Sequence, residues 1–153
     1  SLVGSEMCIR DRSELAAEAK RDLDIDDTFE NLHQESYKNQ RIRPKWNEYK
    51  AKYKLLIFQL KADHRRLYLD KWEYYAGKSD PKTYSEKPFD MKVLKTDLDM
   101  YINADEETIE SEKKIEYYKT ILGLIEDTLK SIEQRGWDIK NAQQQQIHLA
   151  GGF

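Results

Sequence analysis

The feature that most constrains the fold is the stretch from Lys45 to Ala76, which contains no glycine and no proline. At about 1.5 Å per residue, a helix over this stretch would be about 48 Å long. Apolar side chains recur along it at steps of three and four residues: Trp46, Tyr49, Tyr53, Leu56, Leu60, Leu67 and Tyr74. Such spacing is typical of a helix face that packs against another helix. We therefore predict one long helix with a packing face.

A second face of this helix lies about 100° further round and alternates cationic with aromatic side chains. Its members are Lys54, Phe58, Lys61, Arg65, Tyr68, Trp72 and Tyr75. Cations bind phosphates and aromatic rings stack on bases, so this pattern favours a nucleic-acid surface. The alternative is a wide buried face whose lysines reach solvent at their tips.

The positive charge of the chain is concentrated around this helix. Residues 38–82 contain 13 Lys and Arg against 5 Asp and Glu, whereas the whole chain has a net charge of −3. A concentrated basic face on an acidic protein is expected of a polyanion binder. With 36% charged residues and a mean hydropathy of −0.92, the chain is also very polar for a monomer with its own core. We therefore expect the core to be completed by oligomerisation.

The N-terminal residues 1–12 resemble the translation of a sequencing adapter, and we exclude them from the fold and the function. The single cysteine, Cys8, lies in this segment, so no intrachain disulfide is possible, which fits a reducing cytoplasm. No stretch approaches 18 uncharged apolar residues, so we predict no transmembrane span.

Local signals predict where the helices begin and end. Ser13 is expected to cap a first short helix, and residues 27–30 have the form of a capping box. Pro44 is expected in the first turn of the long helix. Residues 77–90 are polar and contain two prolines, which predicts an exposed loop. Residues 89–102 are expected to form a short helix, and a strand that begins at Val93 and Leu94 is the alternative.

A second long apolar pattern lies between residues 105 and 134. Its side chains step by three and four residues: Ile115, Tyr118, Leu122, Ile125, Leu129 and Ile132. We predict that this face is the oligomer interface, and an intrachain hairpin core is the alternative. Gly136 is expected to end the helix, and Asp138 to cap a final short one. The predicted fold class is therefore all-α, with a long basic helix and shorter C-terminal helices.

Signatures of catalysis are missing from the sequence. It contains no phosphate-binding glycine loop and no nucleophile elbow, and its three histidines, His33, His64 and His148, lie far apart. His64, beside two arginines, is expected to lie near phosphate. We predict that the protein is not an enzyme and has no catalytic residue, no metal and no cofactor.

Three stretches resemble the UvsY recombination mediator family of T-even-like bacteriophages: the block that ends in KWEYYAG, the following EKPFDMKVLKTDLD, and the C-terminal KSIEQRGWDIKNAQQQQIHLAGG. Their order and spacing carry the resemblance over about residues 24–152. The resemblance implies one helical domain over residues 13–153, with a DNA-binding part at about 24–77, the loop at 77–90 and an oligomerisation part at about 91–152.

The same resemblance implies a function. A protein of this kind forms a ring-like homo-oligomer of about six or seven subunits. It binds single-stranded DNA and helps to load a RecA-like recombinase onto DNA that is covered by the phage single-stranded-DNA-binding protein, in the cytoplasm of the infected bacterial host. The alternative is a structural or adaptor oligomer whose basic face binds an acidic protein partner.

The resemblance also bears on the DNA-binding residues. Lys71 matches a cationic position that is tied to DNA binding in the family, whereas Leu69 stands where the family has a second basic residue. Arg65 and Arg66 are expected to supply the missing charge one turn earlier. The predicted DNA-binding residues are Lys54, Lys61, Arg65, Arg66, Tyr68, Lys71 and Trp72.

Overall fold

The computed structural model describes residues 10–26, 28 and 30–151, and within these ranges it contains helices and no strand. The elements are α1 (Arg12–Leu23), α2 (Leu32–Tyr75), α3 (Pro81–Glu86), the 3-10 turn η1 (Lys95–Asp97), α4 (Leu98–Ala104) and α5 (Glu106–Leu149). The predicted all-α class is confirmed. The expectation of shorter C-terminal helices is wrong, because α5 has 44 residues, as many as α2. No helix in the described part is long and apolar enough to cross a membrane.

The chain divides into two compact units. Unit 1 comprises residues 1–55 and 119–153, and unit 2 comprises residues 56–118. Each unit contains a segment of α2 and a segment of α5, since both long helices pass from one unit to the other. The sequence suggested parts that follow one another along the chain, at about 24–77, 77–90 and 91–152. The functional roles of those parts remain a prediction.

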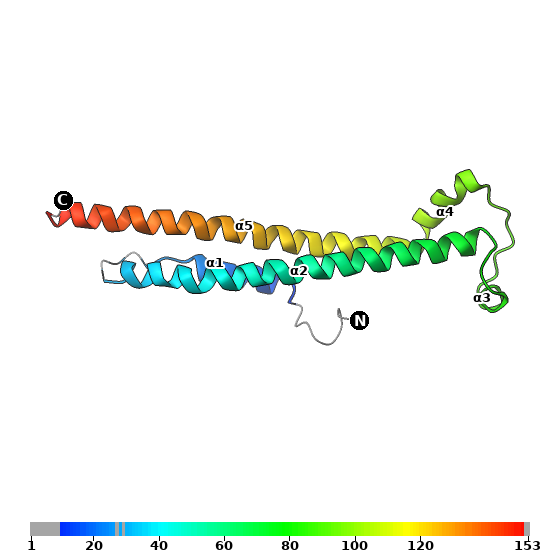
Figure 1. The fold of residues 1–153 in the computed structure, drawn as a ribbon, viewed down its shortest axis with the longest axis horizontal. Helices are drawn as coiled ribbons and strands as arrows, with labels where there is room; N and C mark the ends of the chain where they lie inside the picture. Colours follow the sequence, from blue (N-terminus) through cyan, green and yellow to red (C-terminus); the bar gives the residue numbers. More distant parts are fainter. Residues whose placement is uncertain (1–9, 27, 29, 152–153) are drawn as a thin grey trace. The chain divides into compact units, whose positions relative to one another are not determined.

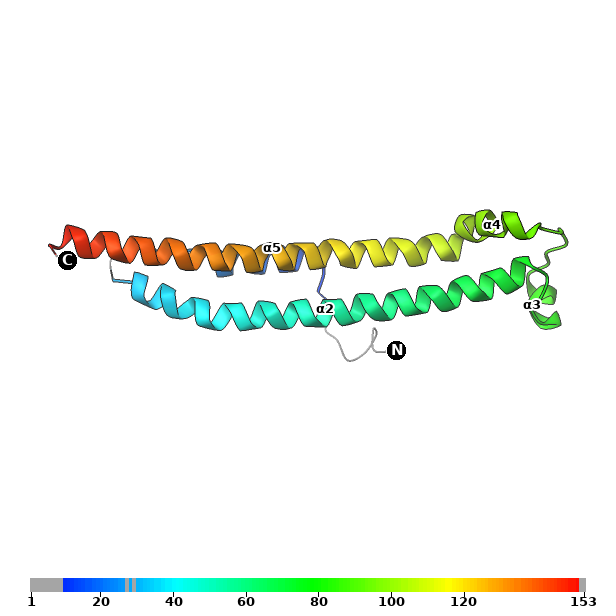
Figure 2. The ribbon, with the colours of Figure 1, turned by 45° about the horizontal axis from the view of Figure 1, so that its top comes forward.

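Unit 1 is a three-helix arrangement of α1, the first part of α2 and the last part of α5 (Figures 1 and 2). Its buried apolar side chains come from all three: Leu15, Ala19, Leu32, Ile42, Trp46, Tyr53, Ile121, Ile125, Ile132 and Ile139. The indole Nε1 of Trp46 donates to Asp22 of α1 at 2.8 Å, so this fully buried ring also meets its polar requirement.

The first described residues take part in unit 1. Arg10 pairs with Glu18 at 2.9 Å, and the hydroxyl of Tyr53 donates to the carbonyl oxygen of Arg10 at 3.0 Å. Asp11 caps α1 by accepting from the backbone N–H of Glu14, so the predicted cap at Ser13 is wrong. Residues 10–12 thus take part in unit 1, whereas the adapter-derived origin of residues 1–12 remains a prediction, and residues 1–9 lie outside the described part.

Helix α2 continues through Pro44, so the predicted start at this proline is wrong. An internal proline removes one backbone hydrogen bond and costs about 3 kcal/mol. Pro44 itself is exposed, whereas Ile42 and Trp46 on either side are buried in the core of unit 1. Burial of these two side chains offsets the cost of the proline. The predicted capping box includes residues 27 and 29, which lie outside the described part.

Helix α5 likewise continues through Gly136, so the predicted helix end there is wrong. A Cβ atom at Gly136 would lie 3.2 Å from the side-chain nitrogen of Asn39 on α2. The glycine therefore permits a close approach of α2 and α5 within unit 1. The buried Ile139 then continues the apolar face, so the final short helix is part of α5.

Unit 2 pairs the last part of α2 with the first part of α5, and α4 completes its core. The buried apolar residues are Leu56, Ile57, Leu60, Leu98, Ile102, Ile115 and Tyr118. Five aromatic rings join α2 to the connecting segment, with centroids 5.0–6.3 Å apart: Tyr74, Tyr75, Tyr84, Phe89 and Tyr101. These rings hold the connection between the two long helices in place.

The connection itself is more ordered than the predicted loop. Gly77 has φ +78°, and the N–H of Lys78 donates to the carbonyl of Glu73 at 2.8 Å, which ends α2 in the left-handed turn typical of glycine. Residues 81–86 then form α3, capped by Asp80. The predicted helix at 89–102 is present only from Leu98.

Asp22 provides a test of the unit 1 core. Burial alone would raise the pKa of Asp22, but the bonds from Lys45, at 2.5 Å, and from Trp46 outweigh it and hold this pKa below its usual value. The ionised carboxylate therefore stabilises the fold above about pH 4, and this stability is lost as the pH falls through the folded-state pKa. Asp22→Asn should lower the free energy of unfolding by about 1.5–3 kcal/mol at pH 7.

The measurement is urea unfolding of both proteins between pH 7 and pH 2. The parent should lose more stability than Asp22→Asn between pH 4 and pH 2, because only the parent has this carboxylate to protonate. Parallel pH profiles would show that Asp22 is not stabilising as an anion.

Candidate nucleic-acid interface

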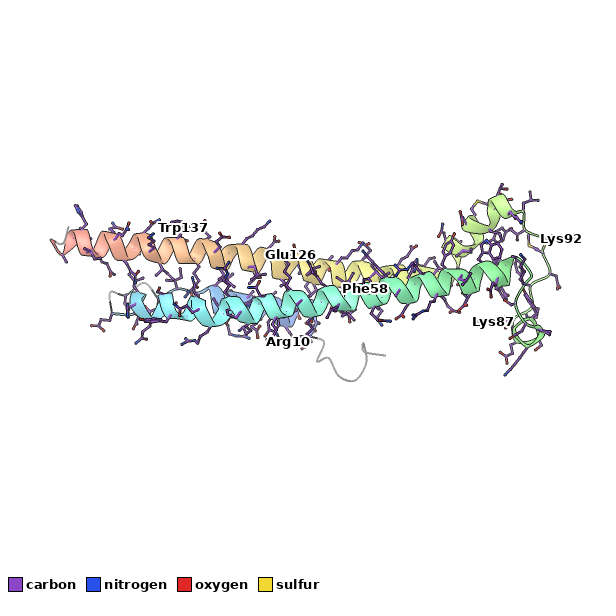
Figure 3. All side chains as sticks on the ribbon, in the orientation of Figure 1. Arg10, Phe58, Lys87, Lys92, Glu126 and Trp137 are labelled. Atoms are coloured by element: carbon purple, nitrogen blue, oxygen red, sulfur yellow. The ribbon has the colours of Figure 1, made fainter. Side chains whose placement is uncertain are left out.

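The predicted basic and aromatic face of α2 is exposed over its first part. In unit 2, Lys61 and Arg65 are exposed, and neither forms an ion pair within the described ranges. Phe58 lies one turn before Lys61, and 66% of its surface is exposed (Figure 3). Lys54 is exposed on the same helix within unit 1. Within unit 2, an exposed ring beside the unpaired Lys61 and Arg65 has the composition of a surface that binds single strands.

The last part of the same face is partly covered by neighbouring elements of unit 2. The hydroxyl of Tyr68 donates to Asp99 of α4, and the hydroxyl of Tyr75 donates to Asp105 at 2.7 Å. Trp72 is half-buried, and the ammonium of Lys78 lies 4.9 Å from its ring centroid. Tyr68 and Trp72 are therefore only partly exposed, whereas Lys61 and Arg65 are exposed.

Lys71 lies in an ion-pair cluster of unit 2. Its side chain is only 14% exposed, and its Nζ lies 3.3 Å from Asp105 and 3.1 Å from Glu107. Burial would lower the pKa of Lys71, but these two carboxylates outweigh it and raise this pKa. Asp105 also accepts from the backbone N–H of Glu107 at the start of α5. Lys71 thus joins α2 to the first turn of α5.

Other residues near the predicted face have different surroundings. Arg66 lies 3.5 Å from Asp63 in an exposed pair, which is worth little. Leu69 is 55% exposed, so an apolar side chain lies open beside the cations. The Nδ1 atom of His64 lies 2.9 Å from the hydroxyl of Ser111 on α5. His64 therefore takes part in the packing of unit 2, and its expected place beside phosphate remains a prediction.

The predicted oligomer interface on α5 is directed into the chain. Ile115 and Tyr118 are buried in unit 2, Ile125 and Ile132 are buried in unit 1, and Leu122 and Leu129 are half-buried. The alternative of an intrachain core accounts for this burial. An interface made by these residues remains a prediction, and Leu122 and Leu129 retain some of the surface that it needs.

Three polar residues on the buried face of α5 were not predicted from the sequence. Thr108, Thr128 and Arg135 are at most 3% exposed. Thr128 meets its polar requirement by donating to the carbonyl of Leu124 at 2.7 Å. Positions 128 and 135 continue the steps of three and four residues from Ile121 to Ile139, so periodicity alone would have found them. A pattern of apolar residues alone does not include them.

Groups suited to metal binding are not gathered in this part of the chain. Among the described residues, no cluster of three or more His, Cys, Asp or Glu side chains could hold a metal ion.

Comparison of the sequence with known families gives a match over most of the chain. The family model described as "Recombination, repair and ssDNA binding protein UvsY" matches residues 18–152. A recombination protein, uvsY of Enterobacteria phage T4, is 25% identical over 138 residues, which are 90% of this chain and 96% of that protein.

The fold is also similar to solved structures. Two crystal forms of the bacteriophage T4 recombination mediator protein UvsY have TM-scores of 0.78 and 0.77, at 23% and 24% sequence identity. The similarity covers 90% and 88% of this chain, and 96% and 98% of the solved chains. At this level of identity, these structures show a shared helical fold.

Proposed function

Since the chain belongs to the UvsY family of recombination, repair and single-stranded-DNA-binding proteins, we propose that it is a recombination mediator that acts on single-stranded DNA. It helps a RecA-like recombinase to assemble on DNA that is covered by a single-stranded-DNA-binding protein. It acts as a ring-like homo-oligomer in the cytoplasm of an infected bacterial host.

One observation carries the assignment of the DNA-binding face: Lys61 and Arg65 are exposed one turn apart on α2, without a carboxylate partner in the described part. An unpaired surface cation keeps its full charge for phosphate, whereas a paired one must first lose its partner. Arg66 extends this face within unit 2, and the exposed ring of Phe58 lies beside it; Lys54 is a further exposed cation on the same helix in unit 1.

The proposed mechanism depends on differential binding. A mediator without nucleotide chemistry shifts an equilibrium only by binding one state of the strand more tightly than another. Here that state is a strand that the recombinase accepts and the coating protein does not. Several subunits in one ring would convert weak contacts by single helices into tight binding through avidity.

The test of this face is the double substitution Lys61→Ala, Arg65→Ala. Losing two phosphate contacts should flatten the slope of log K against log salt for oligo-dT by about 1.4, at about 0.7 per contact. Affinity should fall by about 5- to 25-fold, from about 0.5–1 kcal/mol per exposed ionic contact. Fluorescence anisotropy at several salt concentrations measures both quantities.

The matched control is Lys92→Ala, which removes an exposed lysine from the connection between α3 and α4. It should leave the slope and the affinity close to those of the parent. A double variant that binds oligo-dT like this control would show that the face does not contact DNA. Loss of binding to an acidic protein with normal binding to DNA would favour the adaptor function instead.

A further inference from the structure

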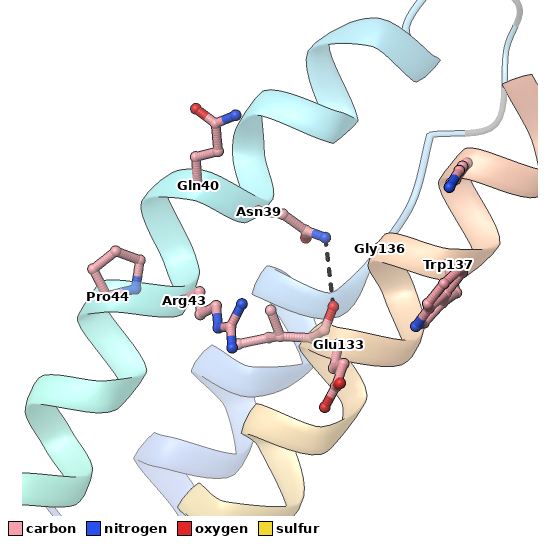
Figure 4. Close-up of a pocket in the computed structure, with 9 residues that line it drawn as sticks. Asn39, Gln40, Arg43, Pro44, Glu133, Gly136 and Trp137 are labelled. Carbon is pink, nitrogen blue, oxygen red and sulfur yellow. Dashed lines mark hydrogen bonds between the residues drawn. The ribbon is translucent and has the colours of Figure 1, made fainter.

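A groove in unit 1 has the composition of a strand-binding site but lies outside the predicted face. It is an open hollow of about 550 Å³ between α2 and α5 (Figure 4). Ile132, Gly136 and Pro44 supply its apolar lining. Asn39 lines the same hollow, and its side-chain nitrogen would lie 3.2 Å from a Cβ atom at position 136.

Trp137 lines this groove with an exposed ring. Trp137 is 56% exposed, whereas Trp46 is fully buried and Trp72 is half-buried. The ammonium of Lys140 lies 5.3 Å from the ring centroid of Trp137. A large exposed indole with a cation beside it offers both a surface for base stacking and a charge for phosphate.

Cations outnumber carboxylates along the groove. Arg43 and Lys140 are exposed, and neither has an ion-pair partner among the residues that the structure describes. A second hollow of about 210 Å³ shares Arg43 and Glu133 with the first and adds two more lysines and one more carboxylate: Lys50, Lys130 and Glu126. The two hollows therefore adjoin, with a net positive lining.

We propose that this groove is a second contact site for single-stranded DNA, in which a base stacks on Trp137 and the neighbouring phosphates contact Arg43 and Lys140. The inference rests on the proposed function and extends it to a second surface. An acidic peptide would satisfy the cations but would leave the indole without a flat partner. A nucleotide satisfies both, because every base has a π-face and every linkage has a charge.

The experiment uses the full chain with Trp72→Phe, so that Trp137 becomes the exposed tryptophan and Trp46 stays buried. Titration with oligo-dT should quench the fluorescence of Trp137. The dissociation constant from this quenching should equal the one that fluorescence anisotropy of a dye-labelled oligo-dT gives. Trp137→Ala should weaken binding by about 5- to 140-fold, which corresponds to the loss of a stacking ring. Trp137→Tyr, which keeps a ring, should restore most of the affinity.

The cations are tested separately with the double variant Arg43→Ala, Lys140→Ala. Arg41→Ala is the matched control. Arg41 is exposed on the same helix but does not line the groove. The pair should flatten the salt slope by about 1.4, and the control should not. Since these side chains are exposed, circular dichroism should show parent-like helicity for all variants.

The outcomes separate this inference from the proposed function. The groove site would be overturned if oligo-dT binds by anisotropy without quenching Trp137, and if the double variant Arg43→Ala, Lys140→Ala binds like Arg41→Ala. The proposed function would still stand. Quenching by polyglutamate but not by oligo-dT would assign the groove to a protein. A change in oligomer size by light scattering, with DNA binding unchanged, would assign it to a subunit contact. If the parent does not bind oligo-dT at all, the proposed function fails as well.

Discussion

Replacing Arg135 with alanine should lower the free energy of unfolding by about 3–5 kcal/mol, the usual cost of breaking a buried ion pair. Arg135 is only 2% exposed. Its guanidinium pairs with the carboxylate of Glu35, and it also donates to the side-chain oxygen of Asn39 at 2.6 Å and to the carbonyl of Asp24 at 3.0 Å. One side chain of α5 thus binds both α2 and Asp24, the residue at which α1 ends and the α1–α2 connection begins.

The physical reason for the large effect is what remains after the substitution. Alanine would leave the Glu35 carboxylate, whose side chain is 15% exposed, without its cation, and would leave carbonyl oxygens without their donor. Burial lowers the pKa of Arg135, yet the guanidinium keeps its charge because its carboxylate and carbonyl partners surround it.

Urea unfolding, monitored by circular dichroism at one fixed protein concentration, measures the change. Arg41→Ala is the control, since Arg41 is exposed on α2 and should change stability by less than about 0.5 kcal/mol. If Arg135→Ala unfolds at the urea concentration of the parent, the cluster does not stabilise unit 1. A double-mutant cycle with Glu35→Ala should give a favourable coupling of about 1–3 kcal/mol between the two residues.

Replacing Lys71 with alanine should lower the free energy of unfolding by about 2–3 kcal/mol while leaving the salt slope of oligo-dT binding unchanged. The effect should be smaller than for Arg135, because Glu107 is 54% exposed and water screens part of the interaction. Asp105, at 12% exposure, would lose its nearest cation while still accepting from Tyr75. We therefore infer that Lys71 stabilises unit 2 through the first turn of α5.

The same two measurements on Lys61→Ala provide the comparison. Lys61 has no ion-pair partner in the described part, so its loss should flatten the salt slope by about 0.7 and hardly change stability. The opposite pattern for Lys71→Ala, a flatter slope with unchanged stability, would show that Lys71 leaves its carboxylates and contacts phosphate. That result would support the role that the family resemblance implied for this residue.

Periodicity in the sequence was sufficient to determine the helical class and about half of the buried apolar residues. The apolar steps of three and four residues identified Trp46, Tyr53, Leu56 and Leu60 on α2, and all four are at most 6% exposed. These predictions depend only on the geometry of an α-helix, which places residues three and four apart on one face. The end of α2 at Gly77 was also predictable, because a left-handed residue favours glycine at a helix end.

Tertiary structure decided which local signals were obeyed and which charges stayed free. Pro44 and Gly136 are helix-breaking signals in isolation, but α2 and α5 pass through them because burial of neighbouring side chains outweighs a local cost of about 1–3 kcal/mol. Likewise, Lys61 and Lys71 are equivalent in the sequence as cations on one helix. Only the fold brings Asp105 and Glu107 to Lys71 and leaves Lys61 open, because an ion pair across 34 or more residues depends on how the helices pack and not on local spacing.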